Sequence, residues 1–189
     1  MDKNLRELIA SDIYRVYGSA PSAKQKLVLN KSLEHKYLRV WRKASFYKKH
    51  KPGSLLAKIY SYKLFQLKNK TQIAIPPEAT IGPGLYLGHL GRVIINENAV
   101  LGKNINLSTG ITIGQANRGS KMGSPTIGDN VWIGTNAVIV GKINIGDDVL
   151  IAPNAYVNMD VPSHSIVIGN PASIHHSENA TKDYINRTI

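Results

Sequence analysis

In the segment IGDNVWIGTNAVIVGKINIGDDVLIAPNAYV, residues 127–157, an aliphatic residue returns at every sixth position. The repeating positions are Ile127, Ile133, Ile139, Ile145, Ile151 and Val157. A period of six fits neither the 3.6-residue repeat of an α-helix nor the two-residue alternation of a half-buried strand. It indicates a coil with short flat sides, in which each hexad forms one side and its aliphatic residue points inward.

The same period extends upstream, with two interruptions. The frame includes Ile75, Ile81, Leu87, then, after a slip of two residues, Ile95, Leu101, Leu107 and Ile113. It pauses over residues 114–126, and a second small or aliphatic residue falls four positions after most members. Glycine often follows the aliphatic residue, and we expect it at corners where the backbone turns sharply. Coils of this kind stack and stabilise one another through nearest-neighbour contacts. We therefore predict a mainly β fold, a parallel β-helix over residues 71–174.

The charge distribution separates residues 1–70 from the repeat. The chain has 189 residues and a formal net charge of +12. Residues 1–70 contain 17 Lys and Arg against 4 Asp and Glu, and nine of the 13 aromatic residues. The remainder contains 7 basic and 8 acidic residues, so the whole positive excess lies in the first third. This predicts a basic unit over 1–70, the β-helix over 71–174, and a tail over 175–189.

The basic unit is expected to be helical. Apolar residues recur at helical spacing from Leu5 to Tyr17, and Gly18 stops the pattern. A second helix is expected from Ser22 to about Lys49, and a third after Ser54, which is a good N-cap. The tail over 177–189 is expected to cap the last coil as a short helix.

Three uses of the basic unit are open: nucleic-acid binding, contact with an anionic membrane surface, or a solvated helical surface. We favour aromatic residues that pack the helices on the rest of the chain, with lysines facing water. Membrane-surface contact is the second choice, and nucleic acid the last, because no binding motif accompanies the charge.

Composition excludes several classes of protein. Cysteine is absent, so disulfide scaffolds, thiolate metal sites and cysteine nucleophiles are excluded. The first residues are charged and lead into no apolar segment, and no apolar run is long enough to span a bilayer. The expectation is a cytoplasmic protein, with the inner membrane surface as an alternative location.

The repeat resembles the hexapeptide-repeat acyltransferase superfamily, and within it the serine acetyltransferase-like branch. The resemblance covers about residues 71–174 and rests on Ile75-Pro76-Pro77, the single His89, the loop after Gly114, and the closing segment 161–172. It implies a left-handed β-helix, a homotrimer whose active site lies between neighbouring copies, and acetyl-CoA as the donor.

His89 is the candidate general base. It lies in Leu87-Gly88-His89-Leu90-Gly91, where the hexad frame slips, and the flanking glycines leave room for a substrate. A neutral imidazole there can take the proton of an attacking hydroxyl. Glu97 matches an acidic position of the family and is a candidate partner, while a backbone carbonyl is an alternative one. The alternative is that His89 is a surface histidine in a bulge and has no catalytic role.

Departures from the family pattern concern the acceptor. The family has Asp at the positions of Ala74 and Gly88, and an Arg-His pair at those of Gly123 and Ser124. Free serine presents an ammonium and a carboxylate, which need charged partners. We therefore favour a saccharide of a capsular or exopolysaccharide as the acceptor, with serine O-acetylation as the alternative. The candidate acceptor-binding residues are Arg92, Asn96, Asn117 and Arg118.

The remaining candidates concern acetyl-CoA. By family position Gly114, Gln115, Thr135 and Pro153 lie along the expected groove, and Lys142 is a candidate for phosphate contact. An N–H at Gly114 would bind the thioester oxygen as charge develops. Plain coil packing is the alternative for each.

Two further readings compete with acetyl transfer. A metal-dependent enzyme of the γ-type carbonic anhydrase kind needs three histidines, and only His89 of the six lies within the repeat, so no metal is expected. A trimeric structural or membrane-surface module is the non-enzymatic alternative. The bulge at His89 and the loop 114–126 disfavour it, because a plain stem needs neither.

Overall fold

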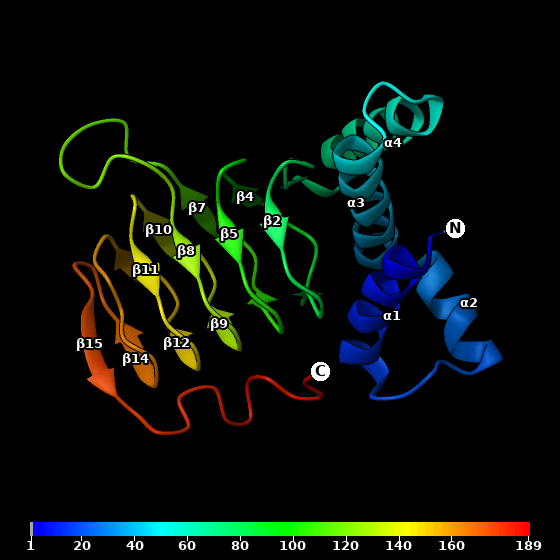
Figure 1. Ribbon diagram of the computed structural model, residues 1–189. Helices are drawn as coiled ribbons and strands as arrows, with labels where there is room; N and C mark the ends of the chain where they lie inside the picture. The colour runs from blue at the N-terminus through cyan, green and yellow to red at the C-terminus, as the bar shows by residue number, and fades with distance from the viewer. Residues whose placement is uncertain (1) are drawn as a thin grey trace.

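The computed structural model describes residues 2–189 and shows a parallel β-helix with a helical unit at one end (Figure 1). The helices are α1 (Lys3–Tyr17), α2 (Ala23–Lys31), α3 (Leu33–His50) and α4 (Leu55–Thr71). Asp2 caps α1 by accepting hydrogen bonds from the N–H groups of Asn4 and Leu5, and Gly18 ends it with a φ of 69°. The predicted start of the last helix at Ser54 is confirmed.

The expectation of one helix from Ser22 to about Lys49 is wrong. The chain breaks at Ser32, which ends α2 and caps α3 by accepting a hydrogen bond from the N–H of His35. Ser32 has extended backbone angles, φ −67° and ψ 127°. No Gly or Pro marks this break, because the serine hydroxyl itself replaces the helical partner of the next turn.

The β-helix has three faces, each a stack of short strands. Face A consists of β1 (Ile73–Ala74), β4 (Val93–Ile95), β7 (Thr112–Gly114), β10 (Val138–Val140) and β13 (Tyr156–Val157). Face B consists of β2 (Thr80–Ile81), β5 (Val100–Leu101), β8 (Thr126–Ile127) and β11 (Asn144–Ile145). Face C consists of β3 (Tyr86–Leu87), β6 (Asn106–Leu107), β9 (Val131–Ile133), β12 (Val149–Ile151), β14 (Ser165–Ile168) and β15 (Ser173–His176).

The register of the strands confirms the predicted period. Within each face successive coils pair in parallel, for example Leu107 with Ile133, and only β15 runs antiparallel to its neighbour. Every member of the predicted aliphatic frame is buried, at no more than 8 % exposure. The second set, four positions later, is equally buried. Burying one such aliphatic side chain contributes about 1.5–3 kcal/mol, so the repeat supplies a continuous core.

The glycines of the repeat act through close stacking rather than through special backbone angles. A Cβ on Gly102 would lie 2.6 Å from the carbonyl oxygen of Gly128, and neither residue has a positive φ. A left-handed turn follows two residues after such a glycine, and other residues, stacked in a column, form this turn. This column consists of Gly84, Asn104, Asn130, Asp148 and His164. Asn and Asp adopt such angles more readily than other non-glycine residues.

The helical unit closes the open end of the first coil. Tyr37 and Trp41 of α3 are buried in one continuous core with the coil residues, which confirms the expected packing role for these two aromatic residues, whereas Tyr62 and Phe65 of α4 are exposed. The Tyr37 hydroxyl accepts a hydrogen bond from the N–H of Ile75 at 3.0 Å, and the indole N–H of Trp41 donates to Pro76 O at 3.1 Å. Burial raises the pKa of the Tyr37 hydroxyl well above its usual range.

The expectation of a C-terminal helix is wrong. Residues 177–189 form turns and run back along the outside of the β-helix toward α1 (Figure 1). Thr181 donates to Asp148 in the fourth coil, Tyr184 O accepts from Asn106 in the second, and Asn186 O accepts from Arg15 of α1. The tail therefore ties the late coils to the helical unit, and its polar contacts replace the helical hydrogen bonds.

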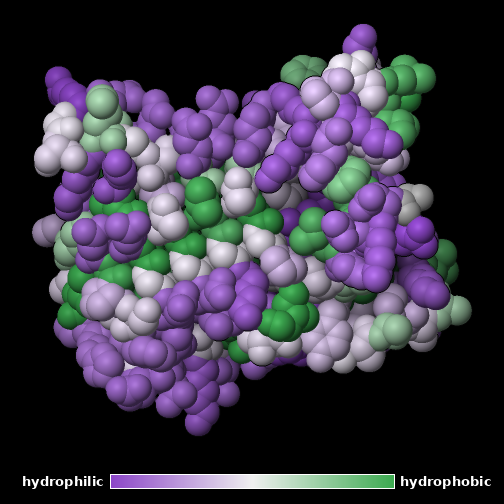
Figure 2. Space-filling view, viewed as in Figure 1, coloured by the Kyte–Doolittle hydropathy of each residue, from purple (hydrophilic) through white to green (hydrophobic). Residues whose placement is uncertain are grey.

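None of the helices described between residues 2 and 189 has the length and apolar character needed to cross a bilayer. Figure 2 shows a band of apolar residues across the β-helix, with hydrophilic residues above and below it. The helical end carries mostly hydrophilic residues in the same view.

Candidate functional site

The candidate residues lie on two edges of the three-sided β-helix. The C–A edge consists of the connections from face C to face A, and it carries His89, Arg92, Thr135 and Pro153. The A–B edge consists of the connections from face A to face B, and it carries Asn96, Glu97, Gln115, Asn117, Arg118 and Lys142. Gly114 ends β7 on face A, at the start of the A–B edge. Strand β4 and the width of face A separate the two edges.

The structure explains the frame slip at His89. Leu87 pairs with Leu107, and Ile95 pairs with Ile113. Eight positions therefore separate Leu87 from Ile95 in the first coil connection, whereas six separate Leu107 from Ile113 in the next. The two extra residues lengthen the connection 88–92, and His89 is exposed in it. Gly91 has a φ of 138°, and a Cβ there would lie 3.1 Å from the Thr109 side chain. This position therefore requires glycine for the insertion to fit.

Glu34 is the acidic residue that the sequence reasoning missed. It lies in the first turn of α3, where the Ser32 hydroxyl donates to its carboxylate at 2.7 Å. Burial raises the pKa of Glu34. Hydrogen bonds from Ser32 and from its own backbone lower this pKa, as do the nearby His35 and His89, and together they outweigh the effect of burial. The net effect holds the Glu34 pKa below its usual value. An acidic residue beside the Ser32 cap was the available signal, but its proximity to His89 depends on how α3 docks.

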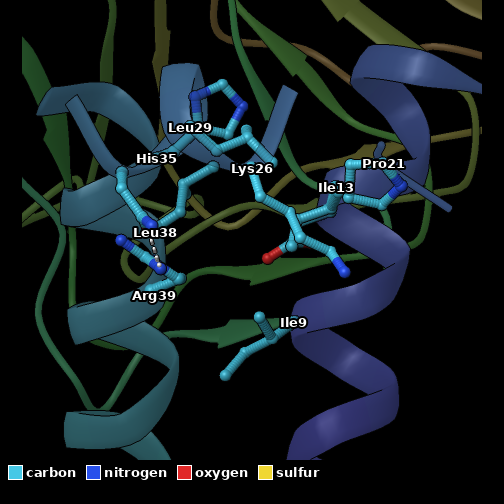
Figure 3. A pocket seen from close by; sticks show the side chains of 10 residues that line it. Ile9, Ile13, Pro21, Lys26, Leu29, His35, Leu38 and Arg39 are labelled. Atoms are coloured by element: carbon cyan, nitrogen blue, oxygen red, sulfur yellow. Dashed lines mark hydrogen bonds between the residues drawn. The ribbon is translucent and has the colours of Figure 1, made fainter. Parts of the chain in front are cut away.

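His35, next to Glu34, belongs to the same local network. Its Nδ1 lies 2.8 Å from the Ser32 hydroxyl oxygen. Burial lowers the pKa of His35 more strongly than the neighbouring Glu34 raises it, and Arg39 lowers it further. His35 also lines a cavity of about 280 Å³ between α1, α2 and α3, together with Ile9, Ile13 and Leu38 (Figure 3). None of the candidate residues predicted from sequence lines this cavity.

The A–B edge carries the long loop predicted from the pause in the period. Ala116 and Gly123 exchange two backbone hydrogen bonds at 3.0 Å, which closes the loop at its base. Lys121 of the loop donates to Asn158 O in the fifth coil. The loop therefore projects from the edge and is held against later coils (Figure 1). Its residues Asn117 and Arg118 are exposed.

Asn96 and Ser124 form a neutral pair at the inner part of the same edge. The Ser124 hydroxyl donates to Asn96 Oδ1 at 2.8 Å. The side-chain amide of Gln115 donates to Asn117 Oδ1 at 2.7 Å. Glu97 is exposed on this edge, so within one chain it lies across face A from His89.

The arrangement on the C–A edge can support proton transfer beside a long narrow ligand. Coils stack at a spacing of about 4.8 Å, so Thr135 and Pro153 lie about 10 and 14 Å along the edge from His89. His89, Glu34 and Arg92 place a base, a carboxylate and a guanidinium at one end of this edge.

Comparisons with known proteins agree with this architecture. Residues 124–158 match the family described as "Bacterial transferase hexapeptide (six repeats)". The chain is 40% identical over 102 residues to serine acetyltransferase 4 of Arabidopsis thaliana, a match that covers 54% of this chain and 29% of that protein. The curated relatives share 37–40% identity with it, and the matches span 29–60% of their lengths.

Solved structures give the same result over nearly the whole chain. Neisseria gonorrhoeae serine acetyltransferase in complex with serine has a TM-score of 0.75 and 28% identity, covering 92% of this chain and 70% of that one. Brucella abortus serine acetyltransferase in complex with coenzyme A has a TM-score of 0.76 and 26% identity, covering 93% and 69%. The fold and these matches define a left-handed β-helix of the hexapeptide-repeat superfamily. Within it, the chain is similar to serine acetyltransferases, and it spans less than two thirds of the length of the curated relatives it matches.

Proposed function

We propose that the chain is an acetyl-CoA-dependent O-acetyltransferase of the serine acetyltransferase type, with His89 as its general base. One observation carries the proposal: the coil makes its two-residue insertion at His89, and α3 brings the Glu34 carboxylate to the same end of the edge. The similarity to serine acetyltransferases supports the reaction class.

In this mechanism the neutral imidazole of His89 accepts the proton of the acceptor hydroxyl as its oxygen attacks the thioester carbonyl of acetyl-CoA. The new C–O bond forms, the tetrahedral intermediate collapses, and the C–S bond breaks. The sulfur leaves as a thiolate and receives the proton from the imidazolium. The Glu34 carboxylate stabilises the transient positive charge of the imidazolium.

Acetyl-CoA is proposed to lie along the C–A edge, with its thioester near His89. Thr135 and Pro153 follow His89 on later coils of this edge, in line with an extended pantetheine arm. Gly114, Gln115 and Lys142 lie on the A–B side, so they join the same site only when a second copy is present.

We propose a homotrimer, because the candidate residues are divided between two edges of the coil. In a cyclic trimer each copy presents one edge to the next, so the C–A edge of one copy faces the A–B edge of its neighbour. Asn96, Glu97, Asn117 and Arg118 of the neighbour would then complete the acceptor side of the site at His89.

L-serine is the acceptor that the neighbouring charges support best. Glu34 lies close enough to His89 to interact with it electrostatically, and Arg92 lies in the same connection as His89, so we propose that they pair with the ammonium and carboxylate of a free amino acid. Glu34 supplies one carboxylate near His89, where Ala74 and Gly88 replace two Asp residues of the family pattern. The sequence-based preference for a saccharide rested on these two positions and on Gly123 and Ser124 of the A–B edge.

A saccharide acceptor remains the second candidate because of one feature of the A–B edge. The neutral pair of Ser124 and Asn96 lies where the family has a charged pair, and neutral side chains suit sugar hydroxyls. Contact of the basic unit with an anionic membrane would favour a lipid-linked glycan. Replacing Lys43, Lys49 and Lys51 by Glu should then weaken binding to anionic vesicles.

The experiment is release of CoA from acetyl-CoA, followed with a thiol dye, with and without L-serine. The chain has no cysteine, so the protein contributes no background. Serine-dependent release that is lost in His89→Ala, but kept in the control His175→Ala, supports the proposal. Binding of acetyl-CoA without serine-dependent release moves the acceptor to a saccharide. Absence of both binding and release overturns the proposed reaction.

A further inference from the structure

A basic groove lies between α3 and α4, on the helical unit and apart from both candidate edges. It has a volume of about 500 Å³. One wall comes from α3 and the other from α4, and its residues are Lys36, Arg39, Val40, Lys43, Tyr60, Lys63, Gln66, Leu67 and Lys70. Five of these nine carry a positive charge and none is acidic.

The positive charges lie in two rows on facing helices. Lys36, Arg39 and Lys43 follow one another at helical spacing on α3, and Lys63 and Lys70 lie two turns apart on α4. Like charges at such spacing destabilise a helix by a few tenths of a kcal/mol per pair. Two facing rows add further repulsion across the groove, which an anion would relieve.

Among the residues that the structure describes, no acidic side chain lines this groove. Residues 1–70 contain four acidic side chains, and the structure places each of them elsewhere. Asp2 caps α1, Glu7 pairs with Lys3, Asp12 pairs with Arg42, and Glu34 accepts from Ser32. Among the described residues, no ion pair involves any of the five groove cations.

The groove has a rigid floor. The Tyr60 ring stacks on Tyr47 with 5.6 Å between ring centroids and an angle of 4° between planes. The ammonium groups of Lys43 and Lys63 lie 5.1 and 5.6 Å from the Tyr60 ring centroid. Arg39 lines both this groove and the cavity between α1, α2 and α3, and its Nη1 is held by donating to Asn30 Oδ1 of α2 at 2.9 Å. Cations held on fixed stems around a ring lose less freedom when an anion binds.

We infer that this groove binds a compact anion with several phosphate groups, such as a diphosphate or triphosphate. Phosphate oxygens accept charge-assisted hydrogen bonds from Lys and Arg, and the planar fork of Arg39 matches two oxygens of one phosphate. Five cations suit the three to four negative charges of such a group better than the charge of a single phosphate. The groove is a second anion site, distinct from the coils proposed to hold acetyl-CoA.

The test is titration calorimetry of the full chain with inorganic triphosphate. We expect one triphosphate per chain, weaker binding of inorganic phosphate, and a rise in melting temperature with triphosphate. Lys63→Gln/Lys70→Gln should weaken triphosphate binding by about 10-fold or more, because it removes both α4 cations from the groove. Lys36→Gln/Lys43→Gln should do the same from the α3 side.

A matched control is Lys24→Gln/Lys31→Gln on α2, which removes the same charge from exposed positions outside the groove. An equal loss in this control would overturn the proposal, because binding would then follow net charge alone. The absence of binding heat and of any melting shift at millimolar triphosphate would also overturn it.

Two further arms separate the sources of phosphate. Phosphatidylglycerol vesicles that bind through the groove residues, without competition by triphosphate, would replace the free anion by a membrane and overturn the proposal. A single-stranded oligonucleotide that binds the groove and resists displacement by triphosphate would also overturn it. Displacement of either by triphosphate supports the compact anion.

Discussion

Arg42 on α3 and Asp12 on α1 form a buried ion pair, with hydrogen bonds of 2.9 and 2.8 Å between the guanidinium and the carboxylate. Their side chains are 3% and 5% exposed. Arg42 also donates to the carbonyl oxygens of Ile81 and Gly82, and Asp12 accepts from the N–H of Leu85. The pair therefore joins two helices to the first coil and satisfies backbone groups that the helices cover.

Removing one partner of this pair should destabilise the protein strongly. Asp12→Ala leaves the Arg42 charge buried without its carboxylate, and it also leaves the N–H of Leu85 without an acceptor. The free energy of unfolding should fall by about 3–5 kcal/mol, as for other broken buried pairs. Urea denaturation measures the loss, and Asp2→Ala, which removes only a helix cap, is the control. A loss below about 1 kcal/mol would contradict a structural role for the pair.

Close stacking at the glycine column should make Gly102→Ala destabilising. The added methyl group would lie 2.3 Å from Asp129 Oδ1 and 2.6 Å from Gly128 O, so the coils must separate. We expect a loss of about 1–3 kcal/mol from this overpacking. Gly88→Ala is the matched control, since its nearest contact would be a Tyr86 ring carbon at 3.7 Å. Equal melting temperatures for the two variants would contradict this account.

The fold could be predicted from the sequence because the six-residue repeat of aliphatic residues is periodic and local. The hexad frame predicted which residue of each side is buried, and Leu87 to Ile95 predicted where the coil inserts residues. The break at Ser32 was missed because a hydroxyl that caps a helix looks the same in sequence as one on a helix surface. The tail was missed because its contacts, such as Thr181 to Asp148, are distant in sequence and follow no period.

Only part of the candidate site could be predicted from the sequence, because some of its contacts join residues that are distant in the chain. Hexad register assigns His89 and Glu97 to different edges once the coil is built, but it does not reveal which helix covers the edge. Glu34 reaches its place through the docking of α3, which depends on Tyr37, Trp41 and the pair of Asp12 with Arg42. Such packing between units leaves no short pattern in the chain.

Protonation of Asp148 should lower the stability of the protein in acid. Burial raises its pKa, but hydrogen bonds from the hydroxyl and backbone of Thr181, from His164 and from Ala180 lower it further. Because the folded-state pKa is depressed, this stabilisation is present above the unfolded pKa of about 4 and is lost as pH falls through the folded value. The melting temperature of Asp148→Asn should therefore vary less than that of the wild type below about pH 4. Parallel curves for the two proteins would contradict the prediction.

Deprotonation of His164 should lower the stability of the fold as pH rises. The hydrogen bond to the Asp148 carboxylate at 3.0 Å raises the pKa of the His164 imidazole, which outweighs a small effect of burial. A raised folded-state pKa stabilises the fold below the unfolded pKa of about 6.5, and this is lost as pH rises through the folded value. His164→Asn keeps a residue that tolerates the left-handed turn, and it should remove the loss of stability that occurs as pH rises from about 6.5 through the folded-state pKa. An unchanged pH profile would contradict this role.

Glu34→Gln tests the proposed carboxylate beside His89. Removing its charge should lower kcat/KM for the acceptor by about 10- to 100-fold, the effect of about 1.5–3 kcal/mol. If Glu34 holds a serine ammonium, the loss falls mainly on KM for serine. If it stabilises the imidazolium, the loss falls on kcat. Glu97→Gln is the comparison, and a larger effect there would make Glu97 of the neighbouring copy the partner of His89.

The division of the candidate residues between two edges makes a prediction about mixtures of inactive chains. His89→Ala removes the base from the C–A edge, and replacing residues 117–122 by Gly-Gly removes the loop from the A–B edge beyond the base that Ala116 and Gly123 close. Each variant alone should be inactive while keeping the β-helix, because neither change touches the buried frame.

When the two are unfolded together and refolded as mixed trimers, some sites combine an intact His89 with an intact loop from the neighbour. Random assembly predicts about a quarter of the wild-type activity in a 1:1 mixture. Thiol release in the mixture measures this recovery, and mixing without refolding is the control for exchange of subunits. If mixed trimers form and no activity returns, each site belongs to a single chain, and the proposed placement of acetyl-CoA between neighbouring copies is wrong.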